Sequence, residues 1–244
     1  MIGFAKAIAN GVSAILTGFA NSFYLNFIKD DRWLYLVKGL GVTLEVTLFA
    51  VIFGIIIGFI VAIIRSTYDK TGNLKILNFF CNIYLTVIRG TPVVVQLMII
   101  YFIIFASFRV DKVFVAIVAF SINSGAYVAE IVRSGIMSID KGQTEAGRSL
   151  GFNYVQTMWY IIIPQAFKNV LPALGNEFIV LLKETSVSGY IALTDLTKGG
   201  DIIRSQTYSP MMPLLAVAAI YLAFVMLFTY LLKILERRLR SNER

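Results

Sequence analysis

Long apolar stretches of this sequence alternate with short polar segments rich in charged residues, glycine and proline. An α-helix needs about 20 mostly apolar residues to cross the roughly 30 Å hydrocarbon core of a bilayer. Stretches of this length and character occur at residues 43–64, 79–107, 113–132, 170–193 and 211–235. The pattern therefore predicts an all-α integral membrane protein with about five transmembrane helices.

The second stretch is interrupted by the sequence RGTP at residues 89–92. Pro92 cannot donate a backbone hydrogen bond, and it disfavours the helical conformation at Thr91. We therefore expect a break or kink here, with Arg89 facing protein, water or the cytoplasmic interface, because a guanidinium in lipid is costly. The alternative is a short helix that ends at Arg89, followed by a span that starts after Pro92.

The first 32 residues have a mixed composition, with Asn10, Ser13 and Asn21 among apolar side chains. An amphipathic helix on the outer surface of the membrane fits this pattern better than a cleaved signal peptide or an additional span. The predicted organisation is an extracytoplasmic amphipathic segment at residues 1–38, a transmembrane domain at residues 39–236 and a basic cytoplasmic tail at residues 237–244.

Lysine and arginine in short loops set the orientation of a membrane protein, because the loops that are rich in these cations stay on the cytoplasmic side. With a cytoplasmic C-terminus, the inner side carries more of these cations than the outer side. Most of the difference comes from the C-terminal sequence KILERRLRSNER. With five spans, this orientation places the N-terminus outside.

The composition supports a membrane location. Hydrophobic residues make up 58% and charged residues 15% of the chain, and the mean hydropathy is +0.78. Soluble domains carry about 25% charged residues. The net charge of +8 comes mostly from cations that flank the spans, so it does not indicate a nucleic-acid partner.

The sequence lacks the usual residues of catalysis and metal binding. It has no histidine and one cysteine, Cys81, which excludes an internal disulfide and a zinc-type ligand set. It contains no GxxxxGK[S/T] phosphate loop, no GxSxG motif and no HExxH motif. We therefore expect no catalytic residue, no metal site and no ATP-binding site in this chain.

Polar side chains inside the predicted spans are candidate substrate contacts. Asn123, Ser124, Tyr127 and Glu130 recur at helical spacing. A polar stripe of this kind lines either a substrate path or a contact between helices. Glu130 could instead simply pair with Arg133.

Two further features of the spans are open to more than one interpretation. Glu177 and Lys183 lie in the fourth span, where charged residues are candidates for a functional role, although they could also neutralise one another. Gly54 and Gly58 are four residues apart, which lets another helix approach closely. That helix belongs either to a second subunit or to the same bundle.

The segment after the third span is polar and rich in bend-forming residues. Asp140 and Gln143 form a capping-box pattern, so we expect a short helix to start there. Gly151 stands where that helix would end in left-handed backbone.

The second half of this segment predicts another short helix. Asn153 and Gln156 repeat the capping pattern, which predicts a helix over residues 154–163. Pro164 should end or bend it. The whole segment is either an idle amphipathic connector or a docking surface for a cytoplasmic partner.

This segment also carries a known signature. Membrane permease subunits of bacterial ABC importers that work with a substrate-binding protein share the pattern E-A-A, three residues, G, nine residues, I-x-L-P. The corresponding residues here are Glu145, Ala146, Gly147, Gly151, Ile161, Ile163 and Pro164. The spacing agrees throughout, and the two departures are conservative, with Gly147 in place of alanine and Ile163 in place of leucine. The chain therefore resembles this family.

Other stretches narrow the resemblance. RGTPVVVQL, NSGAYVAEIVRSGI, IPQAF and LLKETSV look like sequences of the polar amino acid uptake permeases, which serve substrates such as histidine, arginine, glutamine and cystine. The resemblance covers about residues 39–236 and leaves the N-terminal segment outside. It implies the type I ABC importer permease fold and a location in the bacterial cytoplasmic membrane.

The resemblance implies partners as well. Two permease subunits, identical or paired with a homologue, would pack around a translocation path. Two cytoplasmic ABC ATPase subunits would use ATP and Mg, and an extracytoplasmic amino-acid-binding protein would deliver the substrate. This chain would bind no cofactor. Residues 145–164 would couple it to the ATPase, with Glu145 and Gly151 at the family's key positions.

On this interpretation, ATP closes the ATPase dimer, and the coupling segment changes the side that the substrate site faces. The expected substrate-path residues are Asn123, Ser124, Tyr127, Glu177 and Lys183. A non-ABC transporter or a structural membrane protein is the alternative. Five spans in one copy argue against a secondary transporter, which typically has inverted repeats. The transported amino acid and the make-up of the permease dimer stay open.

Overall fold

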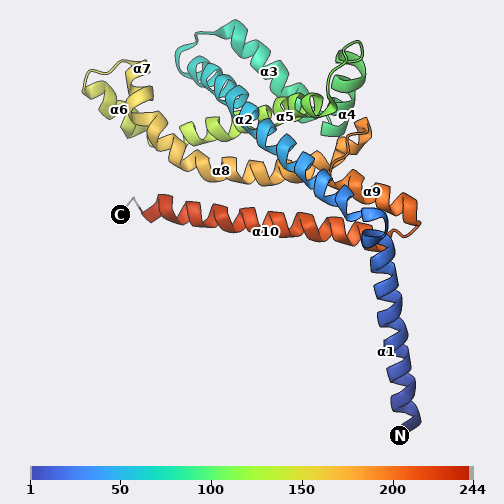
Figure 1. Cartoon of the computed structure of the whole chain (residues 1–244). Coiled ribbons are helices and arrows are strands. Elements are labelled where there is room, and N and C mark those ends of the chain that lie inside the picture. Colours follow the sequence, from blue (N-terminus) through green and yellow to red (C-terminus); the bar gives the residue numbers. More distant parts are fainter. Residues whose placement is uncertain (1, 242–244) are drawn as a thin grey trace.

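Residues 2–241 are described by a computed structural model, with side chains described at residues 10, 11, 13 and 16–239. The α-helices are α1 Ile2–Phe23, α2 Trp33–Thr71, α3 Lys75–Gly90, α4 Val93–Ile99, α5 Lys112–Met137, α6 Lys141–Ser149, α7 Tyr154–Thr157, α8 Ile163–Glu184, α9 Leu196–Thr207 and α10 Met211–Ser241 (Figure 1). The π- or 3-10-helical turns are η1 Tyr24–Ile28, η2 Lys29–Asp31, η3 Ile100–Ile104, η4 Met158–Ile162 and η5 Thr185–Ile191. The described range contains no strand, so the predicted all-α class is confirmed. Residues 242–244 of the predicted basic tail lie outside this range.

The described helices include α2, α5 and α10, which are long and apolar enough to cross a membrane. The pair α3 and α4–η3 meets the same criterion as a broken span, bent by 111° at residues 91–92. The break that Pro92 predicts is therefore confirmed. Helix α8 also runs along the bundle (Figure 1), but it contains Lys168, Glu177 and Lys183 and does not meet the apolar criterion.

Two span boundaries differ from the prediction. Helix α2 has 39 residues, about 58 Å at 1.5 Å per residue, because it continues as a helix beyond the apolar stretch at residues 43–64. The predicted fourth span, residues 170–193, is two elements. Helix α8 starts earlier, at Ile163, and ends at Glu184, and a 3-10 helix follows to Ile191.

The bundle has two ends, which are named here for the helices found there. The α6 end contains the α2–α3 connection, α6, α7 and the end of α10 (Figure 1). The α9 end contains η1, the starts of α2 and α10, and α9. Helix α1 leaves the bundle at the α9 end.

The contact between α2 and α5 lies at the centre of the bundle. A Cβ atom at Gly54 would lie 2.9 Å from Ser124 Cβ, and one at Gly58 would overlap Val128. Both glycines therefore let α2 approach α5 of the same chain, which decides between the two interpretations of this glycine pair. A cluster of buried side chains from α2, α4, α5 and α8 surrounds the contact, and it includes Val46, Leu97, Val115, Phe120 and Leu181.

At the α9 end, a buried carboxylate caps α9, and the next residue bonds α9 to α2. Asp195 is 1% exposed, and its side chain accepts hydrogen bonds from the backbone N–H groups of Lys198 at 2.9 Å and Thr197 at 3.3 Å. Burial raises the pKa of Asp195 to about 6, although these hydrogen bonds oppose the shift. The next residue, Leu196, donates its N–H to Thr43 Oγ1 of α2 at 3.1 Å.

The raised pKa of Asp195 predicts a pH-dependent stability. Between its unfolded pKa of about 4 and its folded pKa of about 6, the folded chain binds the extra proton, so the free energy of unfolding falls as pH rises. Asp195→Asn keeps the helix cap and removes the titration. The variant should gain up to about 3 kcal/mol over the parent at pH 7 and lose this gain by pH 4. Thermal unfolding in detergent measures it, and a difference that does not change with pH contradicts it.

Candidate functional site

Helix α6 stands out from the α6 end as a short, capped and largely exposed element. Asp140 caps its start, as the sequence predicts, and Asp140 Oδ1 accepts the N–H of Gly142 at 2.7 Å. The predicted capping box with Gln143 is wrong. Gln143 donates its backbone N–H to the Asp140 carbonyl oxygen, and its side chain accepts a hydrogen bond from Gln165 Nε2 at 3.2 Å.

The end of α6 has the geometry that the glycine predicts. Gly151 has a φ of +81°, in the left-handed region that favours glycine. The N–H of Phe152 donates to Gly147 O at 3.0 Å, and the N–H of Gly151 donates to Arg148 O at 2.9 Å. These two bonds form a Schellman motif, which satisfies the last carbonyl groups of the helix.

The return to α8 is continuously helical from Tyr154 onward. Asn153 and Gln156 form the predicted capping box, with both side-chain-to-backbone hydrogen bonds at 2.9 Å. Of the two outcomes expected at Pro164, an end or a bend of the helix, the end is wrong, because the π-helical turn η4 leads directly into α8. Pro164 lies in the first turn of α8, directly after this π-helical turn.

Gly147 joins the outgoing and returning parts of this loop. It is the buried residue of α6, and a Cβ atom there would lie 2.7 Å from Thr157 Cγ2 and 3.0 Å from Ile161 Cδ1. The neighbouring side chains Glu145 and Ala146 are exposed. Close packing at Gly147 therefore fixes α6 against η4 and leaves its other faces open to a partner.

Inside the bundle, polar side chains from α4, α5 and α8 form a buried seam that consists of Gln96, Asn123, Ser124 and Glu177. Asn123 Nδ2 donates to Gln96 Oε1 at 2.9 Å, and Ser124 Oγ donates to Glu177 Oε1 at 2.9 Å. Of the five expected substrate-path residues, this seam brings together Asn123, Ser124 and Glu177. It favours the helix-contact interpretation for these three.

Gln96 is a residue that the sequence prediction missed. Its Nε2 atom donates to Ile88 O at 2.6 Å, Thr91 O at 3.0 Å and Thr91 Oγ1 at 2.8 Å. The two carbonyl oxygens, Ile88 O and Thr91 O, are acceptors that the break at Pro92 leaves without helical partners. The sequence feature that could have identified Gln96 is an uncharged polar residue four positions after a proline, inside an otherwise apolar span.

The other two expected path residues lie elsewhere. Lys183 is exposed at the end of α8, and the ion pairs found among the described residues do not join it to Glu177. Tyr127 is 38% exposed, and Arg89 lies over its ring at 5.9 Å from the ring centroid.

Arg89 forms an ion pair with Glu130, and both side chains are about 40% exposed. The predicted alternative pairing of Glu130 with Arg133 is wrong. Arg133 is instead paired with Asp69 of α2 at 3.0 Å.

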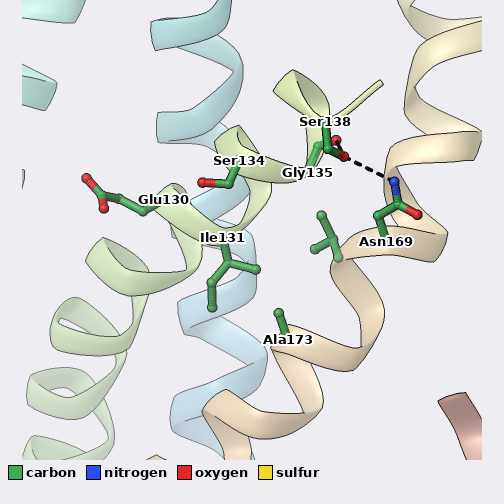
Figure 2. A pocket seen from close by; sticks show the side chains of 8 residues that line it. Glu130, Ile131, Ser134, Gly135, Ser138, Asn169 and Ala173 are labelled. Carbon is green, nitrogen blue, oxygen red and sulfur yellow. Dashed lines mark hydrogen bonds between the residues drawn. The ribbon is translucent and has the colours of Figure 1, made fainter. Parts of the chain in front are cut away.

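An open groove of about 580 Å³ follows α5 toward the α6 end (Figure 2). It is lined by Glu130, Ile131, Ser134, Gly135, Ser138, Asn169, Val170 and Ala173. Asn169 of α8 donates to Ser138 Oγ at 3.1 Å across the two helices, while the carboxylate of Glu130 points away from that pair (Figure 2). Tyr127, Glu130 and Ser134 are three to four residues apart, so they share one face of α5. The groove therefore continues the exposed polar face that starts at Tyr127.

The bundle thus combines apolar helices, an internal polar seam and an exposed, capped helical loop. The sequence profile of the binding-protein-dependent transport system inner membrane component family matches residues 50–241. The chain belongs to this family and is an inner membrane protein.

Relatives of known name are similar to the chain over most of its length. The arginine transport system permease protein ArtQ of Bacillus subtilis is 42% identical, over 68% of this chain and 76% of ArtQ. The glutamine transport system permease protein GlnP of Escherichia coli is 40% identical, over 68% of this chain and 77% of GlnP.

Solved structures share the fold. An amino acid ABC transporter crystallised with histidines superposes with a TM-score of 0.76 at 42% identity, covering 84% of this chain and 94% of that one. The inward-facing MetNI methionine ABC transporter superposes with a TM-score of 0.72 over 86% of this chain and 99% of that one, at 20% identity. The predicted type I permease fold is thus confirmed.

The packing at Gly147 predicts the effect of an added methyl group. Gly147→Ala should destabilise the protein by about 1–3 kcal/mol, because its Cβ atom would overlap Thr157. Adding Thr157→Ala should recover part of this loss in a double-mutant cycle. Ala146→Ser, on an exposed face of the same helix, is the control. Thermal unfolding in detergent reports the effect, and a Gly147→Ala variant as stable as the control contradicts it.

The hydrogen bonds of Gln96 predict a second stability effect. Gln96→Leu should lower the free energy of unfolding by about 2–4 kcal/mol, since it leaves two carbonyl oxygens and the Asn123 amide without partners. The matched control is Gln143→Leu, which changes an exposed glutamine. Equal losses in the two variants would show that Gln96 does not stabilise the break.

Proposed function

We propose that this chain is the permease subunit of an ABC importer for a polar amino acid. It is driven by ATP hydrolysis in a partner subunit that binds α6. The observation that carries the proposal is the position of Glu145 and Ala146. Both are exposed on a helix that Gly147 and two caps fix against the bundle. A rigid, exposed helix can transmit movement, whereas a flexible loop would absorb it.

The proposed orientation places the α6 end in the cytoplasm. The α6 end carries Lys70, Lys75, Lys141 and Arg148, in line with the positive-inside rule. The proposed complex has two ATPase subunits that use ATP and Mg, a second permease subunit and an extracytoplasmic binding protein at the α9 end. The residues proposed for ATPase coupling are those of the signature, Glu145, Ala146, Gly147, Gly151, Ile161, Ile163 and Pro164.

The proposed substrate path follows the exposed face of α5 and the groove beside α8. Tyr127, Arg89 and Glu130 stand at its start. Asn123, Ser124 and Glu177 support this face from behind, and Lys183 stands at the opposite end of α8. A free amino acid carries a carboxylate and an ammonium group. The Arg89–Glu130 pair offers one opposite charge to each of them.

Glu145 gives the direct test of coupling. Glu145→Ala should abolish most ATP-driven uptake in proteoliposomes that contain the ATPase and the binding protein, while the chain still assembles in the membrane. The reason is that α6 loses its exposed acidic contact with the partner, not a contact within the bundle. Asp31→Asn, an exposed acid at the α9 end, is the control. Normal uptake with Glu145→Ala, or uptake that needs no ATPase, would reject the importer proposal in favour of a non-ABC transporter.

The Arg89–Glu130 pair can be tested separately. Glu130→Gln should raise the KM for uptake and change thermal stability by less than about 1 kcal/mol, because a half-exposed ion pair contributes little to stability. The exchange Arg89→Glu with Glu130→Arg keeps the pair but reverses its direction. Full transport by this exchange variant would show that the pair is structural only.

A further inference from the structure

Helix α1 projects from the rest of the molecule. Figure 1 shows it leaving the bundle at the α9 end and running crosswise to α10, one of the membrane-crossing helices. Because α10 crosses the membrane, a helix that runs crosswise to α10 from the α9 end lies along the membrane surface at that end.

The base of α1 is firmly attached to α9. Asn26 of η1 is fully buried, and its Oδ1 atom accepts a hydrogen bond from Thr207 Oγ1 at 2.8 Å. Arg32 donates to Leu25 O at 2.5 Å and to Gln206 Oε1 at 3.3 Å. These bonds join η1 and the start of α2 to the end of α9. The direction in which α1 leaves the bundle is therefore set by side-chain contacts.

The described part of α1 has two unlike faces. Leu16, Phe19 and Phe23 are 63%, 58% and 46% exposed, and their spacing of three and four residues puts them on one face. Asn10, Ser13, Thr17 and Asn21 recur at the same kind of spacing on the opposite side. An apolar face this exposed on a fixed helix needs an apolar environment.

Aromatic side chains mark the level at which α1 joins the bundle. Tyr24, Trp33, Tyr190 and Tyr208 are all exposed, and all lie at the α9 end. Exposed tyrosine and tryptophan gather at the boundary between the hydrocarbon and the headgroups of a bilayer. Tyr24 directly follows α1, so the helix leaves the bundle at this boundary.

We propose that α1 lies in the headgroup region of the bilayer at the α9 end, with Leu16, Phe19 and Phe23 inserted toward the acyl chains and Thr17 facing water. A crosswise helix at the aromatic level contacts lipid along one whole face, as interfacial amphipathic helices do. A span would have to run along α10, whereas α1 runs crosswise to it (Figure 1). The inference is independent of the transported substrate.

Site-specific labelling tests this placement on the full-length chain in phospholipid vesicles. Phe19→Cys and Thr17→Cys each receive an NBD fluorophore, in a Cys81→Ala background that removes the buried native thiol. Nitroxide groups at the lipid headgroup, or at shallow or deep acyl positions, report depth. Aqueous iodide reports exposure to water. Both labelled positions are exposed in the protein, so labelling leaves the bundle intact.

We expect the label at residue 19 to be quenched most by the shallow nitroxide and severalfold less by iodide than the label at residue 17. Three results would overturn the proposal. Equal iodide quenching at both positions would place α1 in water. Strongest quenching of both labels by the deep nitroxide would make α1 a span. Protection of residue 19 from every nitroxide and from iodide would place a protein surface, including a second copy of this chain, over the apolar face.

Discussion

The close approach of α2 to α5 is the constraint on which the rest of this structure depends. Gly54 and Gly58 leave room for Ser124 and Val128, so two long helices pack backbone to backbone along the centre of the bundle. That approach also places Ser124 within hydrogen-bond distance of Glu177 on α8. A bulkier residue at either glycine would separate α2 from α5. It would also break the polar seam that connects α4, α5 and α8.

The buried polar seam and the exposed loop that contains α6 are both connected to helices α5 and α8. In a membrane interior, backbone groups freed by a helix break must find partners within the protein, and Gln96 supplies them at Pro92 while also contacting α5 through Asn123. Helix α5 leads to α6 through the Asp140 cap, and after the turn at Gly151 the chain is helical from Tyr154 through α8. A displacement of α6 would therefore reach both helices that border the groove and the seam.

Much of this arrangement could be predicted from local sequence. Apolar length indicated the spans, Pro92 the break, Gly151 the left-handed turn and Asn153 the capping box, because each of these depends on neighbouring residues. Contacts between distant residues could not be predicted in the same way. The partners of Gln96, Glu177 and Glu130, and the direction of α1, depend on which helices pack together. The helix that was expected to end or bend at Pro164 does not end there, because the π-helical turn η4 leads directly into α8.

The proposed coupling requires that the exposed face of α6 contact the ATPase. A photo-crosslinking amino acid at Ser149 on α6, compared with one at Tyr208 at the α9 end, tests it in the purified complex of permease and ATPase. We expect a crosslink to the ATPase from position 149 that strengthens or weakens when ATP is added, and none from position 208. No crosslink from position 149 in a complex that hydrolyses ATP, or equal crosslinks from both positions, would contradict it.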